Sequence, residues 1–200
     1  DFTYGHEFDR DHIDKAIAKS GRFAYWRAGF PTTAPGSHGT HVASIAGGNN
    51  GICPNAILAG VVFARQPGKK PVTTRDMNHG DGERLRHAIM YLRALAEELH
   101  LPVVINISLG RHCGAHDGSN PLCREIDALS AGPGCCVVIA AGNAGDSGNS
   151  SAAEGRVHAS GWVRKGAPVT LQWRVENNDP TDNEMEIWYS ERCHFKLTVT

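Results

Sequence analysis

Two histidines, His38 and His41, open a segment of small and apolar residues that ends at Gly47 and Gly48. The pattern predicts a short helix, because Ser37 can cap its first turn and either glycine can supply the left-handed conformation that ends it. Its small side chains favour a buried helix. An imidazole held in one place at the front of such a helix is suited to proton transfer, and a capping or core histidine is the alternative interpretation.

Two polar segments elsewhere in the chain follow strand-like apolar runs. Ser108-Leu109-Gly110 comes after residues 103–107, and Gly142-Asn143 comes after residues 136–141. An asparagine at a strand end can offer its carboxamide N–H without carrying a charge, whereas a turn asparagine and a simple strand terminus are the plain interpretations. Parallel sheets bind ligands at the carboxyl ends of their strands, so the pattern predicts both segments on one rim.

The elements that position these residues alternate along the chain. Continuous apolar runs predict buried strands at 56–63, 103–107 and 136–141. One-sided apolar spacing predicts a helix over 81–99, Ser119-Asn120-Pro121 predicts the start of another, and a weaker helical signal covers 13–17. Strands alternating with helices predict an α/β fold, with a parallel sheet flanked by helices on both faces.

The residue pattern changes after Ser160. Residues 169–176, 185–189 and 195–199 alternate or are apolar and predict short strands around a polar turn, which is typical of an antiparallel β unit with one solvated face. We therefore expect residues 1–160 to form an α/β core and residues 161–200 an incomplete β-rich insertion or accessory unit. Since the pattern stops in its middle at Thr200, we expect the natural protein to continue.

Composition excludes several classes of protein. The net charge of −1, with scattered basic residues, gives no case for nucleic acid or an anionic membrane as partner. No apolar run approaches the roughly 20 residues of a membrane helix, and the first residues are no signal peptide, so we expect any export signal to lie outside this chain.

Metal sites and disulfides have only weak sequence support. Among six cysteines none has Cys-x-x-Cys spacing, and the pair Cys135-Cys136 favours free thiols. Cys113 and Cys123 could close a loop as a disulfide, or be drawn as a zinc site with His112 and His116, although the spacing matches no known finger. A conceivable calcium cluster comprises Asp179, Asp182 and Asn183, for which a solvated turn is the alternative.

The three motifs together carry a family resemblance. His38-Gly39-Thr40-His41-Val42-Ala43 resembles the histidine motif of the subtilisin-like serine peptidases, the subtilases. The run at 138–143 resembles the segment that bears the subtilase oxyanion asparagine, and the run at 104–110 resembles the family's substrate-binding strand. The resemblance implies His38 as general base, His41 as a buried structural partner and Asn143 as oxyanion donor. It also implies that Ser108, Leu109 and Gly110 bind an extended polypeptide substrate by strand addition.

The departures from the family pattern are equally plain. The Asp-Ser/Thr-Gly motif expected before His38 and the Gly-Thr-Ser-Met-Ala motif expected after Asn143 are absent, and Asp1, Asp9, Asp11 and Asp14 stand in no such context. The β-rich 161–200 is similar to an insertion in bacterial subtilases, including clostridial germination-type members. The chain is therefore interpreted as part of a peptidase whose remaining polypeptide supplies the aspartate and serine.

The resemblance also has implications for the localisation and the cofactors of the protein. It implies secretion or a cell-surface or spore-associated location, no cofactor for the chemistry, and structural calcium as a common family feature. Against the serine endopeptidase stand two alternatives. One is an inactive pseudoprotease or peptide-binding fragment, and the other is a metal-dependent hydrolase that uses His38 and His41, which lacks an acidic third ligand nearby.

Overall fold

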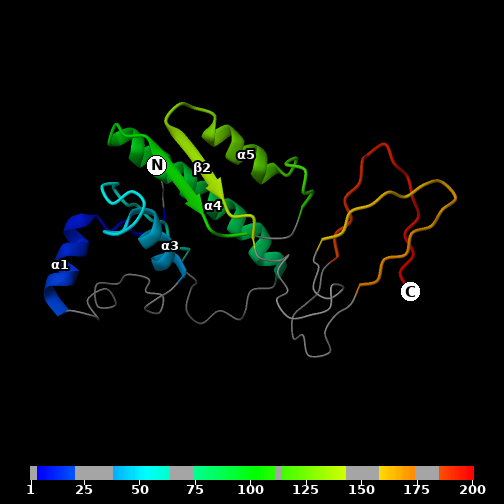
Figure 1. Cartoon of the computed structure of the whole chain (residues 1–200), viewed down its shortest axis with the longest axis horizontal. Helices are drawn as coiled ribbons and strands as arrows, with labels where there is room; N and C mark the ends of the chain where they lie inside the picture. The colour runs from blue at the N-terminus through cyan, green and yellow to red at the C-terminus, as the bar shows by residue number, and fades with distance from the viewer. Residues whose placement is uncertain (1–3, 21–37, 64–73, 111–113, 143–157, 174–184) are drawn as a thin grey trace. The chain divides into compact units, whose positions relative to one another are not determined.

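A computed structural model describes residues 4–20, 38–63, 74–110, 114–142, 158–173 and 185–200 (Figure 1). It contains helices α1 (Arg10–Ser20), α3 (His38–Gly47), α4 (Thr74–Glu98) and α5 (Pro121–Ser130) and strands β1 (Val103–Ile107) and β2 (Cys135–Ile139). The chain divides into two compact units, one of residues 1–69 with 87–103 and one of residues 70–86 with 104–200. The boundary expected at residue 160 stays a prediction.

Helix α4 confirms the predicted one-sided apolar pattern. Ala88, Ile89 and Ala96 are buried, and Ile89 has no exposed surface. The helix begins at Thr74 and not at Asp81 as predicted, so it runs through Gly80 and Gly82. A glycine inside a helix costs only about 1 kcal/mol relative to alanine, which the rest of a 25-residue helix can offset.

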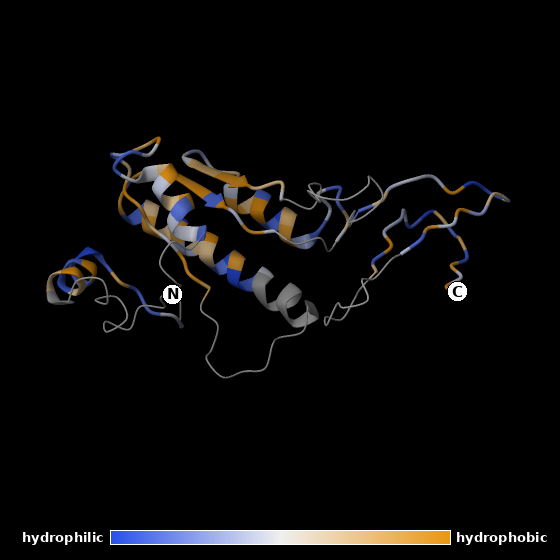
Figure 2. Ribbon diagram, turned by 60° about the horizontal axis from the view of Figure 1, so that its bottom comes forward, coloured by the Kyte–Doolittle hydropathy of each residue, from blue (hydrophilic) through white to orange (hydrophobic). Residues whose placement is uncertain are grey.

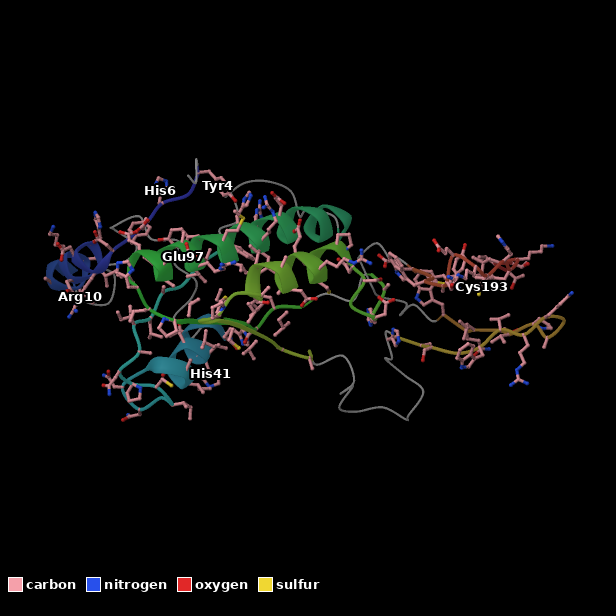
Figure 3. All side chains as sticks on the ribbon, turned by 90° about the horizontal axis from the view of Figure 1, so that it is seen from above. Tyr4, His6, Arg10, His41, Glu97 and Cys193 are labelled. Atoms are coloured by element: carbon pink, nitrogen blue, oxygen red, sulfur yellow. The ribbon has the colours of Figure 1, made fainter. Side chains whose placement is uncertain are left out.

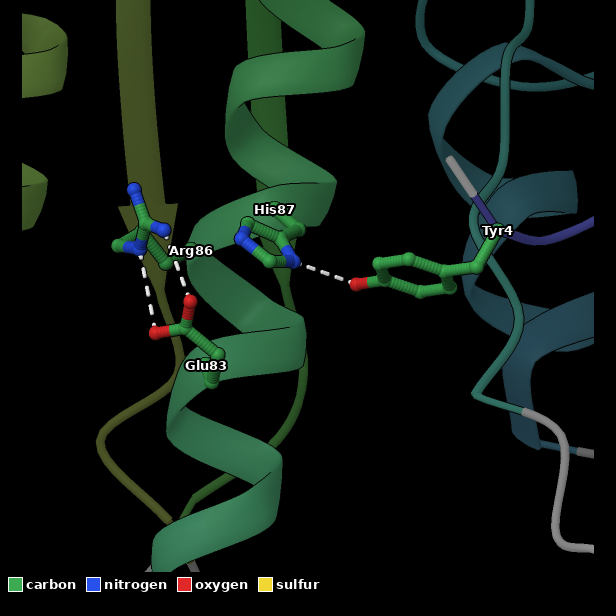
Figure 4. Close-up of polar contacts among 4 residues, drawn as sticks. All are labelled: Tyr4, Glu83, Arg86 and His87. Atoms are coloured by element: carbon green, nitrogen blue, oxygen red, sulfur yellow. Dashed lines mark hydrogen bonds and ion pairs between the residues drawn. The ribbon is translucent and has the colours of Figure 1, made fainter. Parts of the chain in front are cut away.

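Polar contacts at the middle of α4 lie outside this apolar face (Figure 4). Arg86 makes a two-point contact with Glu83, with Nη2–Oε1 and Nε–Oε2 distances of 2.8 and 3.2 Å. In the first unit, Tyr4 Oη shares a short hydrogen bond with His87 Nδ1, so the side chain of Tyr4 contacts α4. Since the Arg86–Glu83 pair is partly exposed, it contributes little to stability.

Strands β1 and β2 form the parallel sheet predicted for 103–107 and 136–141 (Figure 1). Side chains alternate along β1, so that Ile105 and Ile107 are buried while Val104 is 72% exposed. Helix α5 packs on β2 and buries Ile126. The predicted start of α5 is confirmed, because Asn120 caps it and Pro121 occupies its first position.

The predicted strand at 56–63 is wrong. These residues form no strand, and all except Phe63 are exposed. A strand that is apolar on both faces is stable only between neighbouring strands and covering layers. The sheet of the described residues consists of β1 and β2 alone and does not supply them.

The antiparallel unit expected beyond residue 160 is not confirmed. Residues 158–173 and 185–200 form no strand, and their only ladder contact is an isolated antiparallel bridge between Arg164 and Ala167. Apolar residues recur along both segments (Figure 2), and every residue of the two segments is exposed. No described layer covers one face of this pattern, so burial does not stabilise pairing there.

Candidate functional site

Helix α3 presents both histidines at its first turn. The predicted helix is confirmed over His38–Gly47, with His38 as its first residue. His41 lies one turn later (Figure 3). Both residues are exposed, and within the helix only Gly47 is buried. The expectation of a buried α3, and of a buried His41, is therefore wrong for the described structure.

That opposite end is held by the loop that follows it. The N–H groups of Ile52 and Cys53 donate to the carbonyls of Ile45 and Ala46, at 2.9 Å in each case. These bonds satisfy carbonyls that a helix leaves unpaired at its end, so the predicted left-handed glycine is not used. Leu58 lies so close to Gly47 that an added Cβ would contact its side chain.

Strands β1 and β2 end side by side, as predicted for a shared rim. The N–H of Ala140 donates to the carbonyl of Ile107 at 3.1 Å, immediately before the segments that leave the two strands. Gly142 then takes a φ of 87°, a left-handed conformation that suits glycine. Asn143, the predicted oxyanion donor, lies outside the described residues, as does Ser37.

Ser108, Leu109 and Gly110 lie directly beyond β1. Asn106 Nδ2 donates a hydrogen bond to Ser108 Oγ at 2.9 Å, Leu109 is exposed, and Gly110 has open space where a Cβ would stand. The segment is therefore open to an extended ligand in the described structure. His38 belongs to the first compact unit and residues 108–110 to the second, so convergence of the two on one groove stays a prediction.

One aspartate left without a role in the sequence acquires one in the structure. Asp9 precedes α1, and its Oδ1 accepts from the N–H of His12 at 2.9 Å and lies 2.6 Å from His12 Nδ1. These contacts, the backbone hydrogen bond first, hold the pKa of Asp9 below its ordinary value. Asp9 thus caps α1, which gives no support for an orienting carboxylate at this position.

A second polar cluster was not predicted. Glu186 Oε2 accepts from the backbone N–H of Gly114 at 2.7 Å and from Trp188 Nε1 at 2.8 Å. These two donors, and then the charge of His116, hold the pKa of Glu186 below its ordinary value. The cluster joins residues 72 positions apart, and no periodic signal in the sequence marks Glu186 as its centre.

The alternative metal sites acquire no support from the described residues. Cys123 is a free cysteine, and the ring of His116 stacks on that of His158 with centroids 4.5 Å apart. Among the residues described, no three potential ligands gather for a metal ion. Cys113 and His112 lie outside the described part, as do Asp179, Asp182 and Asn183.

The described residues also form a hollow, and they include no membrane-spanning helix. A hollow of about 170 Å³ is lined by Arg86, Glu125, Ala128 and Leu129, none of which was predicted as a site residue. Within the described segments, no helix combines the length and apolar character needed to cross a membrane.

Comparison with known proteins agrees with the sequence pattern. Residues 2–167 match the model of the Subtilase family. The fold is similar to that of the CspB protease of Clostridium perfringens, with a TM-score of 0.55 and 26% sequence identity. The similarity covers 70% of this chain but 29% of that structure, so the chain spans less than a third of it. No curated protein matches the sequence.

Proposed function

The chain belongs to the subtilase family, and we propose that it is part of a serine endopeptidase that hydrolyses peptide bonds in extended polypeptides. Such an enzyme needs a nucleophile, a general base, a carboxylate that orients the base, and donors for the oxyanion. We assign the base to His38 and the oxyanion donor to Asn143. The orienting aspartate and the nucleophilic serine come from other parts of the same peptidase.

The place of His38 in α3 supports this assignment. It is the first residue of α3 and is exposed, so a serine hydroxyl can approach its ring. During acylation the imidazole takes the proton of the hydroxyl, and it then gives the proton to the leaving amine. Both transfers need the ring within hydrogen-bond reach of the reacting atoms.

The observation that carries the proposal is the pairing of Ile107 with Ala140. This bond brings the exits of β1 and β2 together, and Asn143 follows the second exit by three residues from Ala140. A carboxamide at that rim can donate to the oxygen that becomes negative as the carbonyl is attacked. The peptide itself would pair with the backbone of Ser108, Leu109 and Gly110.

The test uses the full-length protein with His38→Ala and Asn143→Ala. We expect the first change to lower kcat by about 10⁶-fold, the loss known for the triad histidine of a subtilisin. The second should lower kcat by about 10²–10³-fold, as for the oxyanion asparagine of a subtilisin, because one donor to the oxyanion is lost. Peptide hydrolysis and fluorophosphonate labelling of the serine are the measurements.

The control variant is His6→Ala, an exposed histidine of the same unit as His38, which should leave hydrolysis unchanged. Binding of peptide without labelling or hydrolysis by the full-length protein would identify a pseudoprotease. Loss of activity to chelators, but not to the phosphonate, would instead support the metal-dependent alternative.

The same proposal makes residues 1–200 inactive by themselves. The aspartate motif and the serine motif are both missing from this sequence. Casein hydrolysis by the isolated chain would therefore refute the proposal that other parts of the peptidase supply these two residues. We also propose, from family membership, a secreted, cell-surface or spore-associated protein. The proposed chemistry needs no cofactor, and calcium titration of the full-length protein tests for structural calcium.

A further inference from the structure

We propose that Asn106 is a positioning residue for substrate binding, whose carboxamide holds Ser108 and the segment leaving β1 in the conformation that pairs with a peptide. The inference rests on the proposed function, since it assigns Asn106 a role in binding the substrate of that peptidase. Its starting point is the hydrogen bond from Asn106 Nδ2 to Ser108 Oγ.

The hydrogen bond lies on the face of β1 that points away from the core. Ile105 and Ile107 are each 5% exposed and occupy the buried face. Successive residues of a strand point to opposite faces, so Asn106 shares its face with the exposed Val104, and Ser108 follows on the same side. The polar character of Asn106 is therefore not required by the core.

The hydrogen bond joins Asn106, a residue of β1, to Ser108, which lies just beyond the strand. Ile107 is held in the sheet by its bond from Ala140, whereas Ser108 is the first residue beyond β1. Asn106 reaches across Ile107 to Ser108 and so restrains the start of the exit segment. Beyond it, Leu109 is exposed and a Cβ added to Gly110 would meet no described atom within 4 Å.

This restraint favours peptide binding for a physical reason. A serine hydroxyl rotates freely unless a partner fixes it, and Asn106 directs a donor at Ser108 Oγ, so the hydroxyl proton must point elsewhere. Pairing of a peptide with a strand uses backbone groups whose ordering costs free energy on binding. A segment ordered before the peptide arrives does not incur that cost, so loss of the bond should weaken binding more than turnover.

The test compares Asn106→Ala, Ser108→Ala and the double variant in the full-length protein. Each single change should raise KM for an extended peptide by roughly two- to tenfold, the scale of one net hydrogen bond, with kcat little changed. The double variant should equal the single ones, since all three lack the same contact. Ser108→Thr keeps the hydroxyl and should restore the wild-type KM.

Controls separate this role from a structural one. Ser130→Ala removes a hydroxyl that donates to Ile126 at the end of α5 and should leave KM unchanged. The rate of fluorophosphonate labelling should be equal in all variants, because the reagent does not need to pair with the strand. Unchanged KM in Asn106→Ala, or effects of the two single changes that multiply, would overturn the inference.

Failure of the proposed function has a different signature. If the wild-type protein is neither labelled nor active, the peptidase proposal fails, and affinity for an uncleaved extended peptide then tests Asn106 by calorimetry. Affinity lowered by two- to tenfold in Asn106→Ala supports the positioning role, and equal affinity refutes it.

Discussion

Two stretches of the chain carry apolar residues in patterns typical of strands, but only one forms strands. Residues 103–139 contain β1, α5 and β2, and Ile105, Ile107 and Ile126 are buried there. Residues 185–200 are also rich in apolar residues, yet Trp188 is 61% exposed and the stretch forms no strand. An apolar pattern therefore indicates which residues can be buried, whereas their actual burial depends on a layer that covers them.

The largest effect should come from removing a buried residue from the first stretch. Ile107→Ala should lower the free energy of unfolding by about 2–5 kcal/mol, because it removes buried methyl groups and leaves a cavity. Leu197→Ala, in the exposed stretch, should change it by less than about 0.5 kcal/mol. Chemical denaturation of the full-length protein measures both values.

Equal losses at Ile107 and Leu197 would break the comparison. Such a result would mean that polypeptide outside these residues covers the terminal stretch in the complete protein. Val199→Ala offers a second exposed position in the same stretch. In either case, Val199→Ala should change the free energy of unfolding by about as much as Leu197→Ala does.

A smaller loss in the free energy of unfolding is expected at the N-terminal cap of α5. Asn120 Oδ1 accepts from the N–H of Leu122 at 2.9 Å, so Asn120→Ala should cost about 0.5–2 kcal/mol through the loss of this cap. Asn120→Asp keeps an acceptor at the same place and should stay near wild type. A full-length Asn120→Ala protein as stable as wild type in thermal unfolding would contradict the prediction.

The smallest effect concerns the contact between the terminal stretch and the loop before α5. The folded pKa of Glu186 lies below its ordinary value of 4.5, chiefly because the Gly114 N–H donates to the carboxylate. The contact therefore stabilises the fold fully above about pH 4.5, and this contribution is lost as pH falls through the folded pKa. The amide resonance of Gly114 should shift over that acidic range.

Glu186→Gln removes the charge but keeps an acceptor, so the Gly114 resonance should no longer titrate below pH 4.5. Glu191→Gln changes an exposed carboxylate of the same stretch and should leave the titration as in wild type. A Gly114 resonance that titrates equally in Glu186→Gln would show that another group causes the shift.

Local signals in the sequence predicted what local physics determines. The Asn120-Pro121 pair located the start of α5, and the apolar run at 103–107 located β1 and the exposed segment that follows it. The histidine motif located α3. These features depend on hydrogen bonds and periodicity within a few residues of one another.

Features that depend on distant residues were missed. The strand predicted at 56–63 and the burial of α3 both require covering layers that a periodic pattern cannot supply. The contact of Glu186 with Gly114 joins segments whose sequences contain no complementary period. For the candidate site, the rim formed by β1 and β2 was predictable, and its convergence with His38 stays a prediction.

Several contacts hold the end of helix α3 that lies opposite His38. The bonds from Ile52 and Cys53, with the side chain of Leu58 against Gly47, hold its far end, and His38 stands at the other end of ten residues. Such a helix is about 15 Å long, so a tilt of about 5° at the held end moves its tip by roughly 1 Å. Under the proposed function, changes in the loop at 48–58 would alter turnover by moving His38, without any substitution of His38 itself.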